Sequence, residues 1–134
     1  MSYALGDSIA PFEIDAVSTE AMKTWAIFLA DPNPIHIDAN AVKARGLGDR
    51  VINQGPINVA YMMNMLMNAF PGGVIKEMDT RFLDNVYGGD RVIASGRIVA
   101  IDGDQIQCEF NLDVDGRGTV NAGSATIRLN SEEK

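Results

Sequence analysis

The chain has 134 residues, of which 46% are hydrophobic and 22% are charged, an ordinary composition for a single globular domain over residues 1–134. Its 18 acidic and 11 basic residues give a net charge of −7, which argues against a general nucleic-acid binder and against adsorption to an anionic membrane. Cys108 is the only cysteine, so no intramolecular disulfide and no cysteine-based metal site can form; we expect no metal and a reducing, cytoplasmic location.

The first predicted elements are a short strand and an amphipathic helix. Apolar and polar residues alternate over residues 12–16, which is typical of a strand. Ser18 is a candidate N-cap, and apolar residues recur over residues 21–29 at the spacing of one helix face. We expect Trp25 and Phe28, which lie in this stripe, to belong to the core.

Two further helices are predicted before the strand-rich half of the chain. A short helix over residues 38–44 leads into a loop, and Pro56 suits the start of a long helix over residues 57–70. The long helix is apolar on nearly all sides and contains four methionines, so we expect it to be buried on most faces.

The rest of the chain alternates between strand and turn patterns. Strands are predicted over residues 74–83, 91–101, 106–114 and 119–129, and residues 102–104 form a tight hairpin signal. Cys108, Phe110 and Leu112 should share one face. An apolar helix followed by antiparallel strands predicts an α+β fold in which a curved sheet covers the helix. Residues 131–134 are typical of a frayed tail.

The only histidine, His36, lies five residues after Asp31 in a segment that contains two prolines. Pro32 and Pro34 restrict the backbone, and the Asn33 side chain can hydrogen-bond the adjacent backbone, so both ionisable groups lie on a stiff loop. A carboxylate and an imidazole held in this way can share a water and move its protons. The alternative is a surface or capping histidine in a proline-stiffened turn.

Residues 53–57 lead directly into the long helix. A helix N-terminus offers free N–H groups and a partial positive charge. Because Pro56 has no N–H, the donors available to a substrate oxyanion are Gly55 and Ile57. The alternative is that Gly55 serves only the geometry of the turn.

Residues 31–36 (Asp-Pro-Asn-Pro-Ile-His) resemble the Asp-x-Asn-Pro-hydrophobic-His motif of the MaoC-like, or (R)-specific, enoyl-CoA hydratases. Weaker similarities lie in residues 51–55, 86–90 and 123–125, and the resemblance as a whole extends over nearly the whole chain, from about residue 5 to residue 129. Ala30 and Gln54 depart from the family pattern, which has glycine and histidine there, and such departures leave the shape of the acyl pocket open.

The resemblance implies a hotdog fold, in which a curved antiparallel five-stranded sheet wraps a long central helix, and dimers whose sheets join edge to edge. It implies addition of water across a trans-2-enoyl thioester, or the reverse dehydration, with coenzyme A thioester as substrate and no cofactor. Asp31 and His36 would hold the attacking water. Gly55, together with Ile57 and Asn33, would bind the thioester. Lys43, Arg45 and Arg50 would contact the coenzyme A phosphates, unless they form a merely solvated loop.

Several assignments stay open at this stage. The carrier could be coenzyme A or an acyl carrier protein, and the chain could form a homodimer or join another hotdog chain in a heteromeric hydratase for a bulky acyl group. A hotdog thioesterase would need a carboxylate on or near the long helix, which has none over residues 57–70. A non-catalytic hotdog subunit would not need Asp31 or His36.

Overall fold

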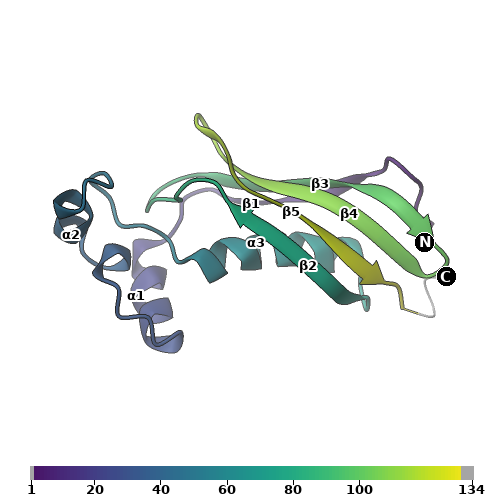
Figure 1. Ribbon diagram of the computed structural model, residues 1–134, viewed down its shortest axis with the longest axis horizontal. Coiled ribbons are helices and arrows are strands. Elements are labelled where there is room, and N and C mark those ends of the chain that lie inside the picture. The colour runs from purple at the N-terminus through teal and green to yellow at the C-terminus, as the bar shows by residue number, and fades with distance from the viewer. Residues whose placement is uncertain (1, 131–134) are drawn as a thin grey trace.

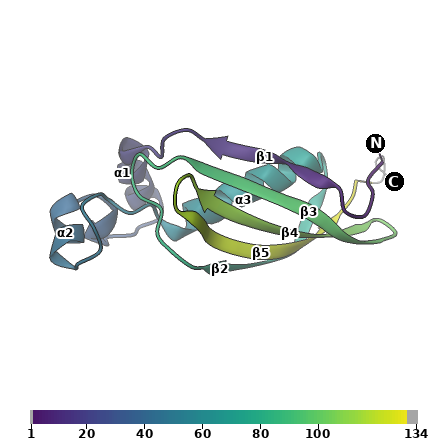
Figure 2. The same ribbon diagram turned by 90° about the horizontal axis from the view of Figure 1, so that it is seen from above.

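The computed structural model describes residues 2–130, so the tail predicted at residues 131–134 lies outside the described residues. One long helix, α3 (Gly55–Ala69), lies across one face of a five-stranded antiparallel sheet (Figures 1 and 2). This arrangement confirms the predicted α+β hotdog fold. In the sheet order β1-β3-β4-β5-β2, the strands are β1 (Ser8–Ile14), β3 (Val92–Asp102), β4 (Gln105–Val114), β5 (Gly118–Arg128) and β2 (Val74–Phe82).

The inward face of the sheet forms the core, because side chains alternate strictly along paired strands. Cys108, Phe110 and Leu112 of β4 all point into this core, as predicted. Phe110 lies opposite Gly123 of β5, where a side chain would place its first carbon 2.9 Å from the Phe110 ring and 2.1 Å from the Asp79 carbonyl oxygen. Only glycine fits there, and the large aromatic ring takes the space.

The long helix is buried or half-buried on most of its faces, as predicted, and its exposed residues lie along one stripe. Met62, Met65 and Leu66 are fully buried against the sheet. Met63, on the opposite side, is 41% exposed, and Asn64 is also exposed. The sheet covers the face of α3 that lies against it (Figure 1), and Met63 on the far side stays at the surface.

Three short helices precede α3 and lie beyond one end of the sheet (Figures 1 and 2): α1 (Thr19–Phe28), the 3-10 helix η1 (Pro34–His36) and α2 (Ala39–Ala44). Ser18 caps α1 as predicted, since its hydroxyl accepts from the Ala21 N–H at 3.0 Å. None of the helices within residues 2–130 is long and apolar enough to cross a membrane.

The prediction that Phe28 belongs to the core is wrong. Its side chain is 76% exposed and packs edge-on against the half-buried Trp25, with ring centroids 5.7 Å apart. Met22 is the residue of α1 that is fully buried. Because α1 lies beyond the end of the sheet, only the Met22 side of its apolar stripe meets the rest of the fold.

Candidate active site

The C-terminus of α1 fixes the position of Asp31. The Ala30 N–H donates to the Ile27 carbonyl at 3.1 Å, and the Asp31 N–H donates to the Ala26 carbonyl at 2.9 Å. This pair of bonds is a Schellman motif, which normally has glycine at the position of Ala30. Ala30 accordingly has φ +50°, the left-handed conformation that alanine disfavours. Asp31 directly follows this cap, which therefore sets the direction in which the chain leaves α1.

Asn33 braces the loop between the two ionisable side chains. Its N–H donates to Asp31 Oδ1 at 3.1 Å, and its own Oδ1 accepts from the Ile35 N–H at 3.3 Å and caps η1. Arg45 donates to the same oxygen at 2.9 Å. The predicted bond from the Asn33 side chain to the backbone is confirmed, and its oxygen is committed to donors within the protein.

Asp31 and His36 face each other. His36 Nε2 lies 3.1 Å from Asp31 Oδ2, with the His36 side chain 9% exposed and that of Asp31 32% exposed. The other ring nitrogen, Nδ1, lies 2.6 Å from the Ile52 carbonyl oxygen. Because a carbonyl only accepts, Nδ1 carries a hydrogen and Nε2 is directed to the carboxylate. His36 Nε2 and Asp31 Oδ2 therefore lie within hydrogen-bonding distance of each other, and imidazole and carboxylate are the side chains most often used to accept and donate protons.

The segment around Ile52, whose carbonyl oxygen contacts His36, leads directly into the N-terminus of α3. Gly55, the first residue of α3, lies three residues after Ile52, and its N–H has no acceptor among residues 2–130. The Ile57 N–H already donates to the Gln54 carbonyl at 3.0 Å. Of the two predicted oxyanion donors, Gly55 is thus the one with a free N–H. A side chain at this position would also come within 3.2 Å of the Phe82 ring of β2, so glycine leaves that ring undisturbed.

A buried polar cluster under the start of α3 was missed in the sequence. The Asn53 side-chain amide donates to Asn58 Oδ1 at 2.9 Å and to the Tyr61 hydroxyl at 3.1 Å. Burial raises the pKa of Tyr61, and the bond from Asn53 partly opposes that rise, so the phenol stays neutral. The available signal was the presence of asparagines near the start of an otherwise apolar helix.

Gln54 joins α1 to α3, since its side-chain nitrogen donates to the Met22 carbonyl at 2.9 Å. The side-chain oxygen of Gln54, Oε1, is buried without a hydrogen-bond partner.

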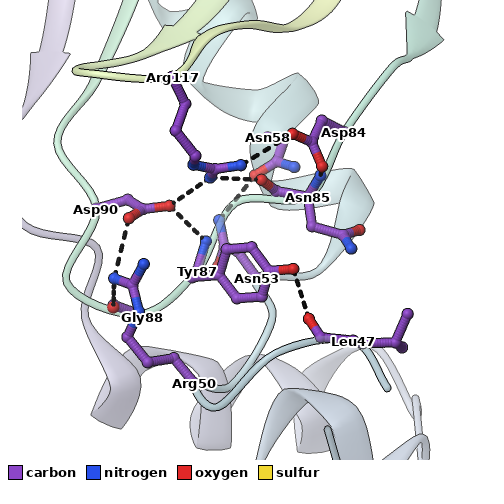
Figure 3. Close-up of polar contacts among 10 residues, drawn as sticks. All are labelled: Leu47, Arg50, Asn53, Asn58, Asp84, Asn85, Tyr87, Gly88, Asp90 and Arg117. Carbon is purple, nitrogen blue, oxygen red and sulfur yellow. Dashed lines mark hydrogen bonds and ion pairs between the residues drawn. The ribbon is translucent and has the colours of Figure 1, made fainter. Parts of the chain in front are cut away.

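The three basic residues expected near a phosphate have different surroundings. Lys43 is exposed on α2, and Arg45 is bonded to Asn33 beside the dyad. Arg50 donates to Asp90 at 3.0 Å and to the Gly88 carbonyl at 2.9 Å (Figure 3). Arg45 and Arg50 are thus already bonded within the protein, whereas Lys43 is exposed.

Two other features of the molecule lie apart from the dyad. An open hollow of about 1200 Å³ is lined by residues of all five strands, and neither Asp31 nor His36 lines it. Burial raises the pKa of the Cys108 thiol to about 11, so this cysteine is a core residue and not a nucleophile. Among the described residues, no group of three or more His, Cys, Asp or Glu side chains is placed to hold a metal ion.

Solved structures with the same fold include known hydratases. An (R)-hydratase from A. caviae involved in PHA biosynthesis superposes with a TM-score of 0.88 at 19% identity, over 96% of this chain and 98% of that one. The R-hydratase PhaJ1 from Pseudomonas aeruginosa gives a TM-score of 0.85 at 18% identity, over 98% and 84%. The ChsH1–ChsH2 complex from Mycobacterium tuberculosis gives 0.86 at 15% identity, over 96% and 100%.

Sequence comparisons agree with the fold. A mitochondrial 3-hydroxyacyl-[acyl-carrier-protein] dehydratase from Arabidopsis thaliana is 26% identical over 89 residues, which make up 66% of this chain and 53% of the relative. This chain thus spans about half the length of the curated relative it matches. The sequence profile of the MaoC like domain matches residues 5–115. The chain therefore belongs to the MaoC-like family of hydratases and dehydratases.

Proposed function

We propose that this protein adds water across trans-2-enoyl thioesters to give (R)-3-hydroxyacyl thioesters, and catalyses the reverse dehydration. The observation that carries the proposal is the contact of 3.1 Å between His36 Nε2 and Asp31 Oδ2, with Nδ1 fixed on the Ile52 carbonyl. A water that bridges Nε2 and Oδ2 would lie within reach of both groups, so both could act on its protons.

In hydration, one member of the dyad removes a proton from the water as its oxygen bonds to the β-carbon. The electron pair of the double bond moves to the α-carbon, and negative charge develops on the thioester oxygen. The free N–H of Gly55, at the positive end of α3, would stabilise that charge. The dyad then delivers a proton to the α-carbon, so protons balance and no cofactor is needed.

The carrier attached to the acyl group is a coenzyme A or an acyl carrier protein, whose phosphates would meet basic groups near the dyad. Lys43 and Arg45 serve this purpose best, because Arg45 already reaches the Asn33 side chain beside Asp31. Reaction in a reducing, cytoplasmic compartment fits the single, buried cysteine.

Assembly with a second hotdog chain, identical or different, is part of the proposal. Two of the structurally similar proteins are named as complexes, ChsH1–ChsH2 and HadBC, both from Mycobacterium tuberculosis. Beside the dyad this chain exposes large apolar side chains, including Ile27 and Phe28. A thioesterase is disfavoured, since α3 carries no acidic residue, and the preserved dyad counts against a non-catalytic subunit.

The test is an absorbance assay of the hydration of crotonyl-CoA and longer enoyl-CoA thioesters. Asp31→Asn and His36→Ala should each lower kcat/KM by at least about 100-fold, because each removes a group that transfers a proton. Asp38→Asn is the matched control: Asp38 is an exposed carboxylate that caps α2, a role that asparagine also fills, and the rate should stay within about twofold. Unchanged rates in both dyad variants would refute the proposal.

A further inference from the structure

Asp90, in the turn between β2 and β3, is a buried carboxylate with several charged and polar donors. The residue is 8% exposed. Its Oδ2 accepts from the Tyr87 N–H and from Arg117 Nη2, both at 2.8 Å, and its Oδ1 accepts from Arg50 Nη1 at 3.0 Å (Figure 3). A buried carboxylate with this many donors is strongly held. Loss of its charge would take the carboxylate partner from Arg50 and leave Arg117 paired with Asp84 alone.

The two arginines close the turn around the Tyr87 ring. The guanidinium carbons of Arg50 and Arg117 lie 5.3 and 5.2 Å from the ring centroid, within the range of cation–π contacts. Arg50 also donates to the Gly88 carbonyl at 2.9 Å, and Arg117 donates to the Asn85 carbonyl at 2.8 Å. Residues 85–90 are therefore held in one conformation by contacts that meet at Asp90.

This turn is bonded to the segment that orients His36. The Asn53 N–H donates to the Val86 carbonyl at 2.7 Å, and the Gly88 N–H donates to the Val51 carbonyl at 2.9 Å. Ile52, between them, forms a bridge with Tyr87. The turn thus fixes the backbone of Ile52, whose carbonyl oxygen lies 2.6 Å from His36 Nδ1.

The same turn is bonded to the start of α1, which ends at Asp31. The Gly89 N–H donates to the Val17 carbonyl, and the Val17 N–H donates to the Asp90 carbonyl, both at 2.9 Å. Helix α1 begins two residues later and ends in the cap that directs Asp31. Both members of the dyad are thus attached to one turn, residues 85–90, which lies far along the chain from residues 31–36.

We propose that Asp90 is a positioning residue, which sets the relative placement of Asp31 and His36 by holding the turn to which both are attached. Its catalytic consequence rests on the proposed hydratase function, whereas its effect on His36 does not. A displacement of about 1 Å between reacting groups can cost about 100-fold in rate, so a loosened turn should reduce turnover without removing either catalytic group.

The experiment uses Asp90→Asn, which keeps the shape of the side chain and removes its charge. We expect kcat for enoyl-CoA hydration to fall by about 10- to 100-fold, with KM changed by less than about threefold. His36 is the only histidine, so its ring nitrogens can be followed by 15N NMR without assignment ambiguity. The native protein should show the hydrogen on Nδ1, and the variant should show a mixture of both ring forms.

Asp84→Asn is the matched control. Asp84 accepts from the same Arg117, at 2.9 Å, but its side chain is 54% exposed and has no bond to the Tyr87 N–H. The kcat and the histidine spectrum of Asp84→Asn should match those of the native protein, with rates within about twofold.

Arg117→Lys is the second test variant, because lysine keeps the charge but cannot make all the bonds of the guanidinium fork.

A folded Asp90→Asn protein with native kcat and a native histidine spectrum would overturn the inference. If this variant does not fold, Arg117→Lys decides, and the same two native readouts there would overturn the inference. If the native protein hydrates no enoyl thioester while the histidine spectrum still responds to Asp90→Asn, the hydratase proposal fails and the positioning of His36 by Asp90 is supported.

Discussion

The sheet and the segment that carries the dyad, residues 17–54, are stabilised in different ways. The sheet pairs its strands residue by residue over a continuous core, in which Leu112 and Ile127 are fully buried. The dyad segment buries a few side chains, such as Val17 and Met22, relies otherwise on caps, turns and hydrogen bonds to the turn at residues 85–90, and leaves Phe28 and Ile37 exposed. Most of the buried core therefore lies in the sheet, whereas the candidate catalytic residues lie in a segment with fewer buried side chains.

The largest stability effect should come from the sheet. Leu112→Ala removes a fully buried side chain of β4 and should lower the free energy of unfolding by about 2–5 kcal/mol, measured by urea denaturation. Leu5→Ala makes the same change at a site that is 69% exposed, and should cost less than about 0.5 kcal/mol. Equal losses at the two sites would contradict the assignment of the core.

An intermediate effect on stability should appear where the turn at residues 85–90 packs against α1. A side chain at Gly88 would place its first carbon 2.5 Å from the Thr19 methyl, so Gly88→Ala should lower the free energy of unfolding by about 1–3 kcal/mol. The second change Thr19→Ala removes that methyl and should restore most of the loss in a double-mutant cycle. Strictly additive effects would show that the turn and α1 do not press on each other there.

The smallest effect should come from the cap of α1. Ala30→Gly relieves the left-handed conformation at φ +50° and should raise the free energy of unfolding by about 0.5–1 kcal/mol. The matched change Ala26→Gly lies within α1 and should lower it by about 1 kcal/mol. Thermal denaturation of both variants measures these changes. A change of the same sign in the free energy of unfolding of both variants would contradict the cap geometry.

The sheet was predictable from the sequence because its information is local. Alternation along residues 106–114 sets the inward face of β4, and the Asp-Gly-Asp turn at residues 102–104 sets the hairpin before it. The caps at Ser18 and Asn33 were predictable for the same reason, since each side chain bonds a backbone group two or three residues away.

The site was only partly predictable because its remaining contacts are not local. Two prolines indicated a stiff loop between Asp31 and His36, but not that the Ile52 carbonyl would fix the ring of His36. The apolar stripe of α1 shows which face is hydrophobic, and it does not show that the sheet ends before reaching Phe28. The joining of Asp90 to Arg50 and Arg117 depends on three distant turns meeting in the fold.

The most direct measurement of the central claim is a kinetic double-mutant cycle on the dyad. If Asp31 and His36 act as one unit on one water, the protein carrying both Asp31→Asn and His36→Ala should have a kcat/KM within about threefold of the slower single variant. If the losses of the two single variants instead multiply, to about 10,000-fold or more from two losses of about 100-fold, the two residues act independently and the shared-water account is contradicted.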